Sequence, residues 1–130
     1  MSVPSYAVSD PVSSVLGYAL DGLALRQRTI ANNLANLDTP QFRATAVDFE
    51  SSLASVLGTA RGASGEQLAG RLTGAAPATA PTNTPVGENG NNVDFRKETL
   101  AAMQSQFQYQ MMSRAVSDRF DLVRTVAQAT

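Results

Sequence analysis

The carboxyl-terminal part of the sequence contains neither glycine nor proline from Asp94 to Thr130. Asp94 is a good N-cap residue, so this pattern predicts one long helix over residues 94–128. Apolar side chains recur along it at helical spacing in two stripes, which together are wider than one partner helix covers. The first stripe comprises Leu100, Met103, Phe107 and Met111, and the second comprises Tyr109, Met112, Val116, Phe120, Val123 and Ala127.

A second long amphipathic helix is predicted near the start of the chain, over residues 10–38. Asp10 and Pro11 suit the N-cap and the first helical position, and Thr39-Pro40 stops the helix because a residue before proline disfavours helical backbone. A stripe of seven residues with alternating steps of 4 and 3, the spacing of a coiled-coil seam, runs along this helix. Its members are Leu16, Leu20, Leu23, Gln27, Ile30, Leu34 and Leu37.

The residues between the two helices fall into two parts. Residues 39–57 are expected to form a turn, an extended segment over residues 42–47 and a short helix capped by Asp48. Residues 58–92 hold seven of the nine glycines and no aromatic residue, so they bury too little apolar surface to offset the entropy of ordering them. We therefore expect a flexible loop over residues 58–92. The apolar face of the short helix comprises Phe49, Leu53, Val56 and Leu57.

These elements predict a mainly all-α single domain over residues 1–130. The two long terminal helices are expected to pack as an antiparallel, coiled-coil-like hairpin, closed by the middle segment. Because a two-helix hairpin covers only one side of each helix, the apolar excess on the last helix indicates self-association or assembly with similar subunits. The alternative is a compact three-helix bundle that uses residues 49–57 as its third helix.

Composition removes most enzyme classes. The 130 residues include no cysteine and no histidine, so thiol chemistry, imidazole bases and the commonest transition-metal ligands are absent. The close acidic pairs lie in no recognisable site motif, and we expect solvated carboxylates and helix caps: no catalytic, cofactor or metal site. A net charge of −1 gives no footprint for nucleic acid. The sequence also lacks an apolar run that spans a membrane, and its start lacks the pattern of a cleavable signal.

Three asparagines, Asn32, Asn33 and Asn36, lie in the last turns of the first helix, where asparagine is a mediocre helix former. The surrounding stretch ALRQRTIANNLANLDTPQFRATAVDFE, the later GNNVDFRKE and a QYQ near the end resemble the rod and hook axial proteins of bacterial flagella. Within that family the likeness is to the B-type proximal rod subunits, with the C-type subunits as a second choice. The family usually has glycine where this chain has Gln41, so whether the turn after Pro40 is altered stays open. The motif residues are Asn32, Asn33, Asn36, Thr39, Pro40, Phe42 and Phe49.

The resemblance implies a structural protein of the flagellar rod, which crosses the periplasm and serves motility. It implies unfolded export through the flagellar type III apparatus without a cleaved signal, followed by helical polymerisation through the terminal helices. The implied partners are copies of the chain, other rod subunits, the basal-body adaptor protein E and the membrane-ring protein. The alternative is a soluble helical adaptor or secretion chaperone that binds one partner without polymerising.

Residue roles follow from these patterns as expectations. Asn32, Asn33 and Asn36 either cap the last carbonyls of the helix or bond to backbone of adjacent subunits, and we expect at least one bond between subunits. Arg26 and Arg28 are expected to pair with Asp118 or Asp121, and Phe42 and Phe49 to anchor the segment after the turn. The residues expected to pack within the helix pair are Leu16, Leu20, Leu23, Ile30, Leu34, Leu100 and Met103. The residues expected between subunits are Phe107, Tyr109, Met112, Val116, Phe120 and Val123.

Overall fold

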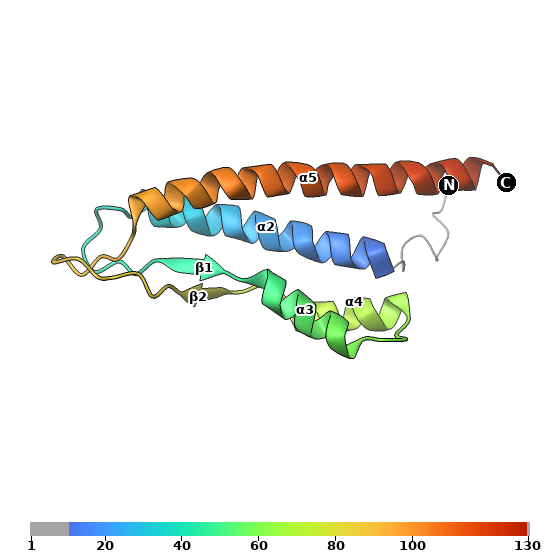
Figure 1. The fold of residues 1–130 in the computed structure, drawn as a ribbon, viewed down its shortest axis with the longest axis horizontal. Helices are drawn as coiled ribbons and strands as arrows, with labels where there is room; N and C mark the ends of the chain where they lie inside the picture. Colours follow the sequence, from blue (N-terminus) through green and yellow to red (C-terminus); the bar gives the residue numbers. More distant parts are fainter. Residues whose placement is uncertain (1–10, 130) are drawn as a thin grey trace.

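The computed structural model describes residues 11–129, so the proposed cap Asp10 lies outside the described residues. The chain is mainly helical, as predicted, with a small two-stranded sheet (Figure 1). The elements in chain order are α2 (Pro11–Ala35), β1 (Thr45–Val47), α3 (Phe49–Thr59), α4 (Gly65–Gly74), β2 (Thr79–Pro81) and α5 (Phe95–Gln128).

Helices α2 and α5 lie side by side and run in opposite directions (Figure 1). The side-chain amide of Gln27 donates to the Oε1 of Gln106 at 3.1 Å, which fixes which turns of the two helices lie level. Leu23 and Ile30 of the heptad-like stripe are buried, whereas Leu16, Leu20 and Leu34 are half-buried. The apolar stripe of α2 therefore has a partner in α5, and supercoiling of the pair stays a prediction.

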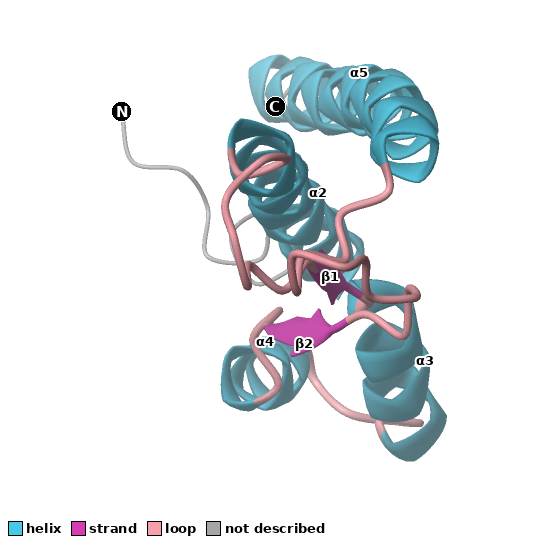
Figure 2. Cartoon of the chain, turned by 90° about the vertical axis from the view of Figure 1, so that its left-hand side faces the viewer, coloured by secondary structure: helices cyan, strands magenta, loops and turns pink. Residues whose placement is uncertain are grey.

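The main core lies on the side of α2 away from α5, where α3, α4 and the sheet pack (Figures 1 and 2). The ring of Phe49 fits against the backbone of α2 at Gly22, where an added Cβ would lie 2.4 Å from the ring. Tyr18 meets Phe49 edge to face, with ring centroids 6.4 Å apart. Helix α2 is thus the central layer, with α5 on one side and α3, α4 and the sheet on the other. The buried core residues are Tyr18, Ala19, Leu23, Val47, Phe49, Val56, Leu68 and Leu72.

The expected loop over residues 58–92 is wrong for residues 65–74 and 79–81, which form α4 and β2. Helix α4 begins with a capping box, in which Ser64 and Gln67 each accept the other's backbone N–H, at 3.2 and 3.0 Å. Leu68 and Leu72, one turn apart, are buried in the core. The glycine content of the whole segment concealed this short amphipathic helix.

The two strands form an antiparallel pair (Figure 2). This pairing brings residues 79–81 beside the segment that follows the turn after α2. The pairing sets Thr45 opposite Pro81 and Val47 opposite Thr79. The extended segment predicted over residues 42–47 is therefore confirmed for Thr45–Val47. Its partner strand lies in the part expected to be a loop, because three residues with proline at one end carry no alternation that predicts a strand.

Helix α3 begins at the predicted cap. The Oδ1 of Asp48 accepts the backbone N–H of Ser51 at 3.1 Å, and its Oδ2 accepts the Ser51 hydroxyl at 2.7 Å. These two bonds hold the pKa of the Asp48 carboxyl below its usual range. Phe49 and Val56 are buried as expected, but Leu57 is exposed because the helix presents only its Phe49–Val56 face to α2 and α4.

Candidate functional site: an asparagine-held turn and an open helix face

The last turn of α2 is capped from within the chain. The side-chain amide of Asn36 donates to the carbonyl oxygen of Asn32 at 2.8 Å, and its Oδ1 accepts the Thr39 hydroxyl at 3.1 Å. The side-chain amide of Asn36 thus adds a second hydrogen bond to the Asn32 carbonyl, which also accepts the Asn36 backbone N–H at 3.2 Å. Of the two roles considered for Asn36, the structure shows the capping role.

Asn33 aligns β1 with α2. Its Nδ2 donates to the carbonyl oxygen of Thr45 at 2.8 Å, and its Oδ1 accepts the Thr45 N–H at 3.2 Å. The Asn33 amide thus pairs with both backbone groups of Thr45, as the backbone of a neighbouring strand does. The side chain has 0% exposure, so a neighbouring subunit cannot reach it. A bond between subunits is therefore wrong for Asn33, while for the exposed Asn32 it stays a prediction.

Asn91 closes the same turn from the far side, and sequence reasoning missed it. Its Nδ2 donates to the carbonyl oxygens of Asn36 and Thr39, both at 2.8 Å, and its Oδ1 accepts the Val93 N–H at 2.7 Å. One buried amide thus joins the end of α2 to the start of α5. The paired asparagines before Asp94 were the available signal, because two adjacent asparagines before a helix cap suit hydrogen-bonded turns.

Asn92 joins the turn to the segment after β2. Its Oδ1 accepts the backbone N–H of Ala44 at 2.6 Å, and its Nδ2 donates to the carbonyl oxygen of Thr84 at 3.3 Å. The Asn92 N–H also donates to the carbonyl oxygen of Phe42 at 3.3 Å. The half-buried Phe42 is thereby held through its backbone, next to the buried amides. We call Asn33, Asn36, Asn91 and Asn92 the amide cluster.

The turn after Pro40 keeps a left-handed residue although glycine is absent. Gln41 has φ of +63°, which L-residues adopt at a cost because Cβ approaches the backbone. Its N–H donates to the carbonyl oxygen of Asn89 at 2.9 Å, and Gly90 packs so closely that an added Cβ would lie 3.1 Å from the Gln41 Cα. The surrounding contacts therefore hold Gln41 in a conformation that glycine adopts more readily than other residues.

Arg26 binds inside the chain rather than across to the end of α5. Its guanidinium donates to the Oε2 of Glu50 at 2.7 Å and to the carbonyl oxygen of Val47 at 2.7 Å. The same group lies 4.8 Å from the centroid of the Phe49 ring, a cation–π distance. The expected pairing of Arg26 with an aspartate of α5 is wrong, because Glu50 and Val47 lie at the level of Arg26.

The two aspartates of that expectation lie elsewhere along α5. Asp121 is 3.9 Å from Arg124, an exposed pair within the helix. Asp118 is exposed, and so is Arg28, the other arginine expected to reach them. Within residues 11–129, these side chains do not link the two helices.

The first apolar stripe of α5 points away from α2. Leu100 and Met103 were expected to pack within the helix pair, and this expectation is wrong. The side of α5 that faces α2 carries instead the buried Glu98 and Ser105, since a small serine lets the helices approach. The exposures along the stripe are 56% for Leu100, 67% for Met103, 63% for Phe107 and 53% for Met111. We call these four residues the outer stripe.

The second stripe of α5 lies toward α2. Tyr109 and Met112 pack against the core of their own chain, which was the alternative to a role between subunits. Val116 and Val123 are half-buried, and the exposed Phe120 lines the edge of a small apolar groove between α2 and α5. The sequence pattern identified both stripes, but Tyr109 and Met112 pack within the chain where Leu100 and Met103 were expected to do so. Phe107 and Phe120, which were expected between subunits, are exposed, and their contact with other subunits stays a prediction.

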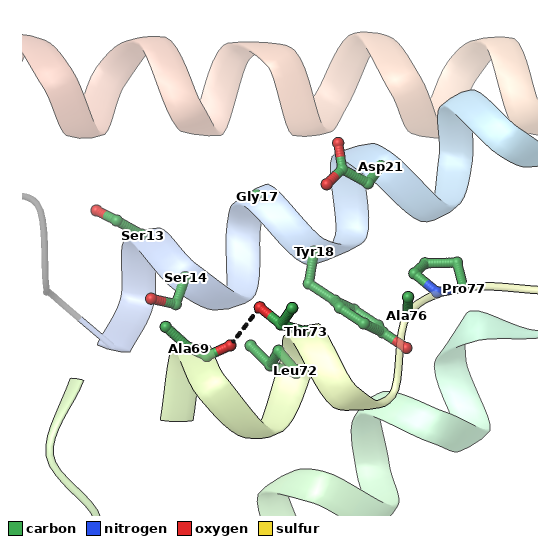
Figure 3. Close-up of a pocket in the computed structure, with 10 residues that line it drawn as sticks. All are labelled: Ser13, Ser14, Gly17, Tyr18, Asp21, Ala69, Leu72, Thr73, Ala76 and Pro77. Carbon is green, nitrogen blue, oxygen red and sulfur yellow. Dashed lines mark hydrogen bonds between the residues drawn. The ribbon is translucent and has the colours of Figure 1, made fainter. Parts of the chain in front are cut away.

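An open groove of about 390 Å³ lies between the first half of α2 and α4 (Figure 3). One side is formed by α2, where Ser14, Gly17 and Asp21 follow one another at steps of 3 and 4. The side chains across the groove are mostly small, and the hydroxyl of Thr73 donates to the carbonyl oxygen of its own helix at Ala69. The groove thus exposes the backbone of α2.

The described residues carry no group of His, Cys, Asp or Glu that could hold a metal ion. Two of the carboxylates singled out in the sequence, Asp48 and Asp94, serve as helix caps. Among residues 11–129, none of the helices is long and apolar enough to cross a membrane.

Residues 15–43, which comprise most of α2 and the turn held by the amide cluster, match the family model described as Flagella basal body rod protein. This match relates the helix and its turn to the rod class of flagellar proteins. The relatives below identify the member of that class more closely.

The flagellar basal body rod protein FlgB of Bacillus subtilis is 31% identical over 123 residues, which cover 83% of this chain and 86% of the relative. FlgB of Escherichia coli is 33% identical over 85% of this chain and 88% of the relative. FlgB of Borreliella burgdorferi is 31% identical over 82% and 88%. The chain belongs to the FlgB family of flagellar basal body rod proteins and is a structural protein, not an enzyme.

Proposed function

We propose that the chain is a structural subunit of the proximal rod, which polymerises helically through its terminal helices and so serves motility. The outer stripe is the observation that carries this proposal, because four large apolar side chains project from one face of α5 with more than half of their surface exposed. Contiguous exposed apolar surface of this kind marks a protein contact.

The geometry favours an open assembly rather than a closed pair. Among the residues that the structure describes, the α2 side carries no matching stripe of large exposed apolar side chains, and its exposed surface includes the groove beside Gly17. Contacts between two different surfaces of identical chains produce rings or filaments, and they produce filaments when the rotation does not close. A shaft that carries torque needs such repeated contacts and no chemical site.

The partners and location are proposed from the family. The subunit contacts copies of itself and other rod subunits, with the adaptor protein E and the membrane-ring protein near the base of the rod. It reaches the periplasm-crossing rod through the flagellar type III export apparatus without a cleaved signal. The exposed outer stripe and the rod-family relatives support a role in assembly over that of an adaptor with one partner.

Phe107→Glu tests the proposal, because a charge in the middle of the outer stripe opposes burial there. We expect loss of tubular particles by electron microscopy of the full chain mixed with rod homologues. Helix content by circular dichroism should stay at the wild-type level, since Phe107 projects from the fold.

Ser117→Glu is the matched control, since Ser117 is exposed on the same helix but lies neither three nor four residues from any member of the outer stripe. We expect particles to form with this variant as with the wild type. If the wild type forms discrete complexes of fixed size instead of tubes, polymerisation is contradicted and the alternative, an adaptor with one partner, is supported.

A further inference from the structure

Within residues 11–129, nothing packs against the position that a side chain at Gly17 would occupy. At Gly22, about one and a half turns further along α2, the Phe49 ring occupies the space that a side chain would need, but at Gly17 no atom of the described chain lies within 4 Å of an added Cβ. Glycine weakens a helix interior, so its presence calls for a close approach by something else. Gly17 lines both the groove between α2 and α4 and the smaller groove between α2 and α5.

The charge beside Gly17 also lacks a partner. Asp21 lines the α2–α4 groove one turn beyond Gly17, and its carboxylate is exposed (Figure 3). Among the described residues, no ion pair or hydrogen bond engages the Asp21 side chain. The α2 side of the groove therefore exposes helix backbone at Gly17 and, about 6 Å along the helix, the negative charge of Asp21.

Helix α5 carries the complementary pattern on its outer face. Arg96 lies one turn before Leu100 and shares its face, since the steps from Arg96 to Leu100 and Met103 are 4 and 3. Arg96 is exposed and likewise has no ion pair within the described chain. One positive charge followed by two large apolar side chains thus leads into the outer stripe.

The two patterns match in opposite directions. Read backwards along α2, Asp21, Gly17 and Ser14 are separated by steps of 4 and 3, the same steps that separate Arg96, Leu100 and Met103 along α5. An antiparallel approach therefore sets opposite charges together and large side chains against small ones. The pairs are Arg96 with Asp21, Leu100 with Gly17 and Met103 with Ser14.

We propose that the outer face of α5 of one copy packs antiparallel into the α2–α4 groove of a second copy, with Leu100 against Gly17 and Arg96 paired with Asp21. This inference rests on the proposed self-assembly and names the two surfaces that meet. A single chain cannot form this contact, because its own α5 lies against another side of α2 with Gln106 level with Gln27.

The first test is Gly17→Leu in the full chain, with Gly70→Leu as its matched control. Both glycines lie inside helices and both have open space around an added Cβ, but Gly70 does not line the groove. For Gly17→Leu we expect unfolding at equal or higher denaturant concentration, together with at least a tenfold loss of association by analytical ultracentrifugation. Gly70→Leu should associate within about threefold of the wild type.

The second test is a charge exchange. Asp21→Arg and Arg96→Asp should each weaken association about tenfold, as reversal of a close interfacial pair does, and the double variant should recover to within about threefold of wild type. If the wild type associates while Gly17→Leu and both reversals associate equally well, the groove contact is overturned and self-assembly stands. If the wild type remains monomeric at high concentration, and also with rod homologues present, the proposed function fails as well.

Discussion

The amide cluster and the outer stripe differ in whether their side chains find contacts within the chain. At the turn, the side-chain amides of four asparagines bond to groups of the same chain, and Asn33 is closed to solvent. Along the outer face of α5, four large apolar side chains have no such enclosure. The polar motif therefore holds together parts of one chain, whereas the exposed apolar stripe is the surface on which the proposed contact between subunits rests.

This division differs in part from what the sequence suggested. At least one of the three asparagines was expected to bond to a neighbouring subunit and so set the register there, because a misplaced buried polar group costs about 1–3 kcal/mol. The same penalty operates within the chain instead: it fixes β1 and the start of α5 relative to the end of α2. A rigid subunit then presents its apolar face in one orientation.

Asn33→Ala tests the comparison most strongly. The variant leaves the N–H and carbonyl of Thr45 without their buried partner, so we expect a loss of about 2–3 kcal/mol in the free energy of unfolding. Urea denaturation of the dilute full chain measures it. Asn32→Ala is the control and should change stability by less than about 0.5 kcal/mol, because Asn32 is exposed. Equal effects from the two variants would remove the special role of Asn33.

Gln41→Gly tests the turn in the stabilising direction. Glycine adopts φ of +63° without the steric cost that Gln41 bears, although it also adds freedom to the unfolded chain. We expect a net gain of about 0.5–1 kcal/mol in the free energy of unfolding, read as a higher urea midpoint. A loss of stability would mean that contacts of the Gln41 side chain outweigh its backbone strain.

Leu100→Ser with Met103→Ser tests the outer stripe in the isolated subunit. Because both side chains are largely exposed, we expect the free energy of unfolding of the dilute chain to change by less than about 0.5 kcal/mol. Assembly at high concentration, followed by light scattering, should be lost. A destabilisation of several kcal/mol in the dilute chain would show that these residues pack within it and would erase the contrast between the two regions.

Features that depend on local pattern could be predicted from the sequence. The two long helices follow from apolar spacing and from the absence of glycine and proline in residues 94–130. The Asp48 and Asp94 caps follow from residue type and position. The turn motif also indicated the rod family, which the relatives support.

Features that depend on contacts between distant residues could not be predicted in the same way. Both stripes of α5 are apolar, so only the packing of α2 decides that Tyr109 faces inward and Met103 outward. The role of Asn91 depends on carbonyls more than fifty residues away. Helix α4 was missed because the composition was judged over all of residues 58–92. Ser64 and Gln67 have the spacing of a capping box, which was a local signal for a helix start.

The level pairing of Gln27 with Gln106 has a consequence for the spacing of an assembly. Within one copy, residues of α2 and α5 that lie level have numbers that sum to 133, as those of Gln27 and Gln106 do. Across the proposed contact, Gly17 lies level with Leu100, and the numbers sum to 117. The difference of 16 residues, at about 1.5 Å each, displaces neighbouring copies axially by about 24 Å. Successive subunits would overlap along their helices. Torque would then pass through contacts between the sides of the helices rather than between their ends.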